Sequence, residues 1–109
     1  GNRLVVGAPA ECSLSAGVGG SETVPISCVG KNGPGAVYVL ARTGTTWAQR
    51  NYVKASNTSG GDLFGVAVAL SGNGDVLAVG ASLEDSAAIG VGGDQNDNAT
   101  ADAGAVYLY

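Results

Sequence analysis

The sequence predicts an all-β protein of short antiparallel strands, and three observations support this prediction. The 109 residues include 19 glycines and few charged residues, a composition that suits tight turns and suits helices poorly. Apolar and small residues form many short runs, several with the period-two alternation of a β-strand. Two apolar motifs recur later in the chain in the same order. No apolar run approaches the roughly 20 residues of a membrane span, so we expect no membrane insertion.

Six segments have the alternation or apolar composition of strands. They are residues 3–8, 36–41, 47–55, 63–70, 76–81 and 105–109. In the third segment, Trp47 and Tyr52 provide bulk, and we expect them to pack rather than to bind a ligand. The charges of Arg50 and Lys54 mark the same segment as an edge strand.

The fourth and fifth segments predict a β-hairpin over residues 63–82. Both arms are apolar or small on both faces, so we expect this hairpin to lie in a sheet that is covered on both sides. Between the arms, residues 71–75 read Ser-Gly-Asn-Gly-Asp, and these residue types favour a tight turn.

An internal repeat sets the domain organisation. Residues 4–9, Leu-Val-Val-Gly-Ala-Pro, return as residues 77–82 at an offset of 73. Residues 35–40, Gly-Ala-Val-Tyr-Val-Leu, return as residues 104–109 at an offset of 69. The two offsets differ because the loop between the two motifs has a different length in each copy, and loops vary in length where strands do not.

One repeated unit therefore has four strands, of which this chain holds parts of two. Residues 1–55 supply the last three strands of one unit, residues 56–62 a polar connection, and residues 63–109 the first three strands of the next. Antiparallel four-stranded units at this spacing are typical of β-propeller blades. We thus expect about one and a half to two incomplete blades.

The motifs Phe64-Gly65, Val79-Gly80-Ala81 and Gly7-Ala8-Pro9 resemble the FG-GAP repeat of integrin α-subunit propellers, in its bacterial and environmental form. The resemblance covers nearly the whole chain except the insertion from Cys12 to Cys28, for which we expect no counterpart in the second unit. It implies an extracellular or cell-surface propeller module for binding or adhesion, with a protein or glycan ligand.

Calcium binding is a further expectation of this resemblance. The turn at residues 71–75 is too short to surround one ion with six or more oxygen ligands, so we do not assign calcium there. The remaining candidate for a cation site is the acidic loop that follows, because its carboxylates and amides are oxygen ligands of the kind that Ca²⁺ takes. Its irregular spacing also fits turns that satisfy their own backbone. The candidate metal ligands are Asp94, Asn96, Asp97, Asn98 and Asp102.

Cys12 and Cys28 are the only cysteines, and no histidine is available to complete a zinc site with them. A disulfide is the favoured interpretation, with two free thiols as the alternative, and it implies an oxidising compartment. Two N-glycosylation patterns, at Asn57 and Asn98, fit a secreted or cell-surface protein.

Charge and residue content argue against two function classes. Residues 55–109 contain seven acidic residues and no basic one, which argues against nucleic acid as a partner. Without histidine, a Ser-His-Asp or Cys-His arrangement cannot form within this chain, so we expect no enzyme. We expect Glu84 and Asp85 to lie in a solvated loop, and residues 90–93 lack the lysine and following helix of a phosphate-binding loop.

The alternative function is structural. Two incomplete units cannot close a ring, so they belong to a longer chain or associate with copies of themselves. The second case describes a structural subunit of an extracellular fibre or assembly, built by pairing of β edges between copies.

Overall fold

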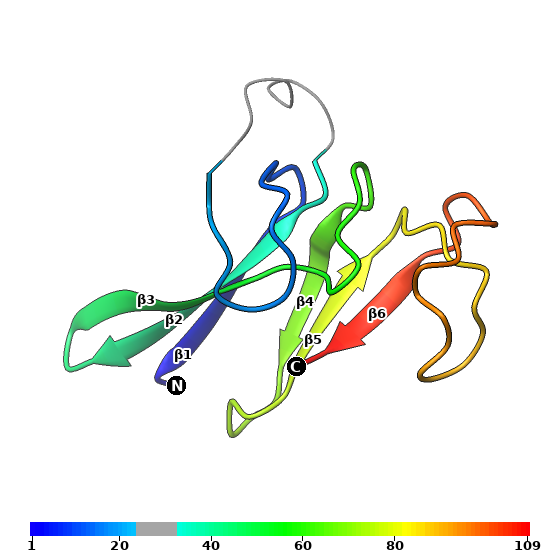
Figure 1. The fold of residues 1–109 in the computed structure, drawn as a ribbon. Coiled ribbons are helices and arrows are strands. Elements are labelled where there is room, and N and C mark those ends of the chain that lie inside the picture. Colours follow the sequence, from blue (N-terminus) through cyan, green and yellow to red (C-terminus); the bar gives the residue numbers. More distant parts are fainter. Residues whose placement is uncertain (24–32) are drawn as a thin grey trace.

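The computed structural model describes residues 1–23 and 33–109, which form two three-stranded antiparallel sheets packed against each other (Figure 1). The prediction of an all-β fold of incomplete propeller blades is confirmed. Within the described residues, no helix is long and apolar enough to cross a membrane. The strands are β1 (Arg3–Ala8), β2 (Ala36–Thr43), β3 (Thr46–Val53), β4 (Phe64–Leu70), β5 (Leu77–Ala81) and β6 (Ala105–Leu108).

Both sheets follow the order that the repeat predicts. The first sheet runs β1-β2-β3 and the second runs β4-β5-β6. In each sheet the Val-Gly-Ala strand pairs with the Ala-Val-Tyr strand, as β1 with β2 and as β5 with β6. β3 lies at an edge, as expected, and Tyr52 is buried on it, whereas Trp47 lies at the surface with the guanidinium carbon of Arg42 5.8 Å from its ring centroid.

The two sheets pack face to face through β1 and β4, with an apolar core between them. The fully buried side chains of this core include Val37, Phe64 and Val79. The close approach of the sheets requires glycine. A Cβ atom on Gly7 would lie 2.0 Å from the backbone oxygen of Gly65, which is far inside van der Waals contact.

The β4–β5 hairpin is covered on one face only, so the expectation of two covered faces is wrong. Val66, Ala67 and Ala69 are exposed, because no other described element packs against that side of the second sheet. The turn itself is as predicted. The Ser71 hydroxyl accepts hydrogen bonds from the backbone N–H groups of Asp75 and Val76 at 3.1 and 2.9 Å.

Candidate functional site

The internal repeat extends into the loop after each Val-Gly-Ala strand. Residues 11–20 read Glu-Cys-Ser-Leu-Ser-Ala-Gly-Val-Gly-Gly, and residues 84–93 read Glu-Asp-Ser-Ala-Ala-Ile-Gly-Val-Gly-Gly. The backbone repeats as well: φ is +72° and +76° at Gly17 and Gly19, and +77° and +75° at Gly90 and Gly92. The expectation that the insertion from Cys12 to Cys28 has no counterpart is therefore wrong for its first nine residues.

In the first unit this loop forms a buried polar cluster with the end of β3. The Nζ of Lys54 lies 2.8 Å from Oε2 of Glu11 and also donates to the backbone oxygen of Ser13 at 2.8 Å. The Tyr52 hydroxyl donates to the same carboxylate oxygen of Glu11 at 2.7 Å. The side chain of Lys54 is fully buried, although the residue directly follows an edge strand.

Burial and pairing compete in this polar cluster. Burial disfavours the ionised form of Glu11, but hydrogen bonds from Lys54, Tyr52 and Ser13 outweigh it and hold the pKa of Glu11 below its usual value. Burial lowers the pKa of Lys54, and the neighbouring Glu11 offsets only part of that effect. Burial also raises the pKa of Tyr52, so its hydroxyl keeps the proton that it donates to Glu11.

The same loop also binds the main chain of β3. The N–H of Gly19 donates to the oxygen of Tyr52 at 2.8 Å, and the N–H of Lys54 donates to the oxygen of Gly17 at 2.9 Å. Val18 and Val53 form an isolated antiparallel bridge. The end of β3 is thus held on both sides, by β2 and by the loop.

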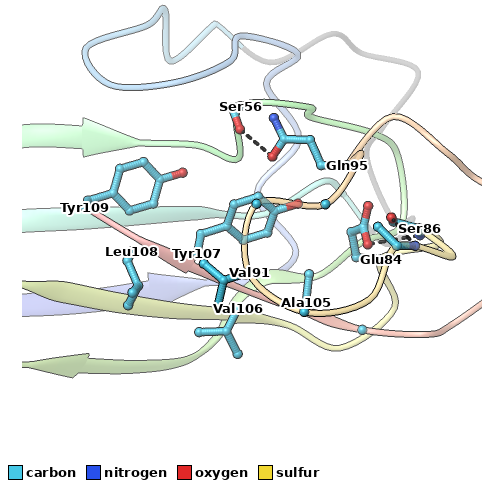
Figure 2. Close-up of a pocket in the computed structure, with 15 residues that line it drawn as sticks. Ser56, Glu84, Ser86, Val91, Gln95, Ala105, Val106, Tyr107, Leu108 and Tyr109 are labelled. Atoms are coloured by element: carbon cyan, nitrogen blue, oxygen red, sulfur yellow. Dashed lines mark hydrogen bonds between the residues drawn. The ribbon is translucent and has the colours of Figure 1, made fainter.

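The equivalent position in the second unit is a groove of about 690 Å³ (Figure 2). One wall is β6 with Tyr109 after it, and the other is the glycine-rich segment 90–93. Ser56 and Gln95 lie at one side of it, where the Ser56 hydroxyl donates to Oε1 of Gln95 at 2.9 Å. The groove therefore lies between the two elements that correspond to β2 and to the Gly17–Gly19 loop.

Glu84 lines this groove and occupies the position that Glu11 has in the first unit. Its Oε2 accepts from the N–H of Ser86 at 3.0 Å, as Oε1 of Glu11 accepts from the N–H of Ser13 at 2.8 Å. Its Oε1 accepts from Nδ2 of Asn57 at 3.0 Å. Glu84 is 2% exposed, so the expectation of a solvated residue is wrong. Among the described residues, its carboxylate pairs with no lysine or arginine.

Two tyrosines border the groove from the core side. Tyr107 packs edge to face against Phe64 with ring centroids 5.4 Å apart, and its hydroxyl donates to Oδ1 of Asn57 at 2.6 Å. The hydroxyl of Tyr109 donates to the backbone oxygen of Lys54 at 2.7 Å. Burial raises the pKa of both phenols to about 12, so both remain hydrogen-bond donors at neutral pH.

The five candidate calcium ligands are exposed in the loop beside the groove. Oδ1 of Asp94 accepts from the N–H of Asn96 at 3.0 Å, and the N–H of Asp102 donates to Oδ1 of Asp85 at 2.8 Å. Within residues 1–23 and 33–109, no three His, Cys, Asp or Glu side chains form a group that could hold a metal ion. Calcium binding in this loop stays a prediction.

The remaining predicted sites are modifications. Cys12 is buried, while Cys28 lies outside the described residues, so the disulfide stays a prediction. Asn98 is exposed, as a glycosylation site requires. The side chain of Asn57 instead binds Glu84 and Tyr107, and a glycan on its Nδ2 would compete with the first of these bonds. Glycosylation at both positions stays a prediction.

Two packed sheets that share two repeat-related strands, β1 with β5 and β2 with β6, and the loop between them define a tandem-repeat protein of the β-propeller blade type. The chain belongs to the FG-GAP repeat family, whose match covers residues 47–109, more than half of its length. The resemblance of the strand motifs to this family is thereby confirmed. No curated protein and no solved structure matches the chain significantly.

Proposed function

We propose that this chain is part of an extracellular or cell-surface β-propeller module that binds a protein or glycan partner and catalyses no reaction. The observation that carries the proposal is the groove between β6 and residues 90–93. Membership of the FG-GAP repeat family supports a propeller-like module, which is often extracellular.

The chemistry of the groove supports binding. Among the described strands, β6 pairs only with β5, so its other side offers main-chain donors and acceptors to the groove. Tyr107 and Tyr109 contribute aromatic surface, and Glu84 contributes a buried carboxylate. Apolar and aromatic surface with a few placed polar groups is typical of binding sites.

The test is binding of the chain to a panel of immobilised extracellular proteins and glycans, measured by biolayer interferometry. We expect saturable binding to one class of partner, weakened at least tenfold by Val91→Glu, which places a charge in the groove wall. Ile89→Glu is the matched control, because Ile89 is exposed in the same loop but does not line the groove. Absence of saturable binding, or equal loss in both variants, would contradict the proposal.

A second candidate function is that of a structural subunit that associates with copies of itself. The exposure of repeat-related residues favours it. Val79 is 0% exposed in the core, whereas its counterpart Val6 on the outer face of the first sheet is 44% exposed. Val37 is 0% exposed, whereas its counterpart Val106 on the outer face of the second sheet is 72% exposed.

Both faces that meet in the core thus have an exposed counterpart on the outside, so a second copy can stack on the first in the same head-to-tail manner. Sedimentation velocity over a series of protein concentrations tests this candidate. A sedimentation coefficient that rises with concentration supports it, and a constant monomer value contradicts it.

A further inference from the structure

We infer that Asn73 is a site of spontaneous deamidation, in which its side-chain amide becomes a carboxylate without an enzyme, and that Arg3 restrains this reaction. Asn73 is exposed in the turn between β4 and β5, and Gly74 follows it. The turn contributes no residue to the groove, so the inference goes beyond the proposed binding function and does not depend on it.

The reaction joins a main-chain nitrogen to the side chain that precedes it. The nitrogen of Gly74 attacks Cγ of Asn73, the bond between Cγ and Nδ2 breaks, and a succinimide ring forms. The proton that the Gly74 nitrogen loses passes through solvent to Nδ2, which leaves as ammonia. Water then opens the ring on either side and gives aspartate or isoaspartate. Water is the only co-reactant, and nothing is oxidised or reduced.

The turn itself requires both residues of this pair. Oδ1 of Asn73 accepts a hydrogen bond from the N–H of Asp75 at 3.3 Å and so helps to close the turn. Gly74 has a φ of +78°, and a Cβ atom on it would lie 2.8 Å from Cδ of Arg3. A glycine after asparagine also leaves the attacking nitrogen without a side chain beside it. The shape of the turn therefore creates a sequence in which the attack is unhindered.

The hydrogen bonds of the Asn73 side chain favour the reaction. The hydroxyl of Ser71 donates to Oδ1 at 2.7 Å, in addition to the N–H of Asp75. Both donors lie where negative charge develops on Oδ1 during the attack on Cγ, so they stabilise the tetrahedral intermediate. Nδ2 donates to Oδ2 of Asp75 at 2.8 Å, and this carboxylate stabilises the positive charge that Nδ2 gains with its proton before it leaves.

The attacking nitrogen, by contrast, is held by the folded turn. The N–H of Gly74 donates to the backbone oxygen of Ser71 at 2.8 Å, and the backbone oxygen of Gly74 accepts a hydrogen bond from the guanidinium of Arg3 in β1. The nitrogen must leave Ser71 before it reaches Cγ of Asn73. The rate of deamidation therefore depends on how often the turn opens, and the bond from Arg3 opposes that opening.

The isoaspartate product weakens the contact between the turn and the first sheet. Its main chain is one carbon atom longer between residues 73 and 74, so Gly74 cannot keep its bonds to Ser71 and Arg3 in their present geometry. Because β1 belongs to the first sheet and the turn to the second, the modification loosens a link between the two sheets. The aspartate product keeps the normal main chain and leaves that link in place.

The test is incubation of the 109-residue chain at mildly alkaline pH, followed by peptide mapping with tandem mass spectrometry and labelling with isoaspartyl methyltransferase. We expect Asn73 to convert faster than Asn98 by roughly tenfold or more, since Asn98 is exposed but is followed by alanine. Both aspartate and isoaspartate should appear at position 73. Conversion of Asn73 at or below the rate of Asn98 would overturn the inference.

Arg3→Met tests the restraint and should accelerate conversion of Asn73 by about threefold or more. Arg50→Met is the matched control, because Arg50 is exposed on β3 at the far side of the first sheet (Figure 1), and it should leave the rate within about twofold. Hydrogen exchange shows whether the change is local. In Arg3→Met, the amide of Gly74 should lose protection while that of the buried Val79 keeps it.

Asn73→Asp separates the effects of the two products, because it introduces the new charge with the normal main chain. This variant should have nearly the Tm of the parent chain, and the purified isoaspartate form should melt at a lower temperature. An isoaspartate form as stable as Asn73→Asp would contradict the loosened link between the sheets. Equal conversion rates in the parent chain and in Arg3→Met, with unchanged exchange at Gly74, would remove Arg3 from the inference.

Discussion

The buried pair between Lys54 and Glu11 joins the end of β3 to the loop that follows β1. Mutation of either residue tests how much this pair contributes to stability. Lys54→Met keeps the volume of the side chain but leaves the Glu11 carboxylate without its cation. We expect a loss of about 3 kcal/mol in the free energy of unfolding. The measurement is urea unfolding followed by tryptophan fluorescence.

The double variant Glu11→Gln/Lys54→Met separates the pair from its individual charges. Because it removes both charges together, it should recover most of the stability lost in Lys54→Met. A double variant as unstable as the sum of the single variants would show that the two side chains do not interact.

The environment of Asp62 leads us to expect that the stability of the protein depends on pH. Burial and the nearby charges of Glu84 and Asp85 raise the pKa of Asp62 to about 6, although the Ser59 N–H that bonds its carboxylate works in the opposite direction. A raised carboxyl pKa means that the folded state binds the proton more tightly than the unfolded state does. This stabilisation is complete below the unfolded pKa and is lost as the pH rises through about 6.

We therefore expect the free energy of unfolding to fall by about 1 to 2 kcal/mol between about pH 4.5 and pH 7, allowing for solvent screening. Urea unfolding at these two pH values measures it. Asp62→Asn should flatten the profile over the same interval, and an unchanged slope in this variant would assign the effect to another group.

Burial of individual charges is the property that the sequence predicted least well. Lys54 and Glu84 both stand in segments whose composition indicates solvent exposure, yet both are buried. The partner of Lys54 lies 43 residues away in the chain, so no local pattern reveals the pair. The repeat of Glu11 as Glu84 at the offset already set by the strands was the available signal, and it became informative only once the first unit showed what Glu11 binds.

At the scale of elements, the contact between β1 and β4 depends on the absence of a side chain at Gly7. Gly7→Ala places a Cβ atom 2.0 Å from the oxygen of Gly65, so the two sheets must separate locally. We expect a loss of about 3 kcal/mol in the free energy of unfolding. Gly72→Ala is the matched control, since a Cβ atom on Gly72 meets nothing within 4 Å, and its stability should change by less than about 0.5 kcal/mol.

The acidic loop from Asp94 to Asp102 carries the prediction of calcium binding. If this loop binds Ca²⁺, adding millimolar calcium to chelator-treated protein raises the Tm, because a ligand that binds only the folded state stabilises it. Differential scanning calorimetry measures the shift, and Asp94→Asn/Asp97→Asn should abolish it. An unchanged Tm in the parent chain would remove calcium from this loop.

The strands themselves were predictable because their pattern is local. The alternation of apolar and small residues placed β1 at its observed bounds and the other five strands within a few residues. The groove was not predictable in this way. It arises where a loop and β6 stand opposite each other with no described strand between them, and that relation depends on tertiary pairing rather than on the composition of residues 84–93.

At the scale of the whole molecule, the two outer faces are the repeat-related counterparts of the two faces that pack in the core. Leu4 and Val6 correspond to the buried Leu77 and Val79, and Val106 corresponds to the buried Val37. The face of the first sheet in one copy therefore has the pattern needed to pack on the face of the second sheet in another. Such an interface is head to tail, because it joins two different faces. A variant of each face can therefore test it more specifically than a measurement of mass alone.

Val6→Glu places a charge on the outer face of the first sheet, and Val106→Glu places one on the outer face of the second. Both positions are already exposed, so neither charge enters the core. If copies associate head to tail, each variant alone should sediment as a monomer, since every contact between its copies would include the face that carries the glutamate. An equimolar mixture should instead form a one-to-one dimer and nothing larger, because only the intact face of each variant can meet the intact face of the other. A mixture that remains monomeric where the parent chain associates would show that the copies meet through some other surface.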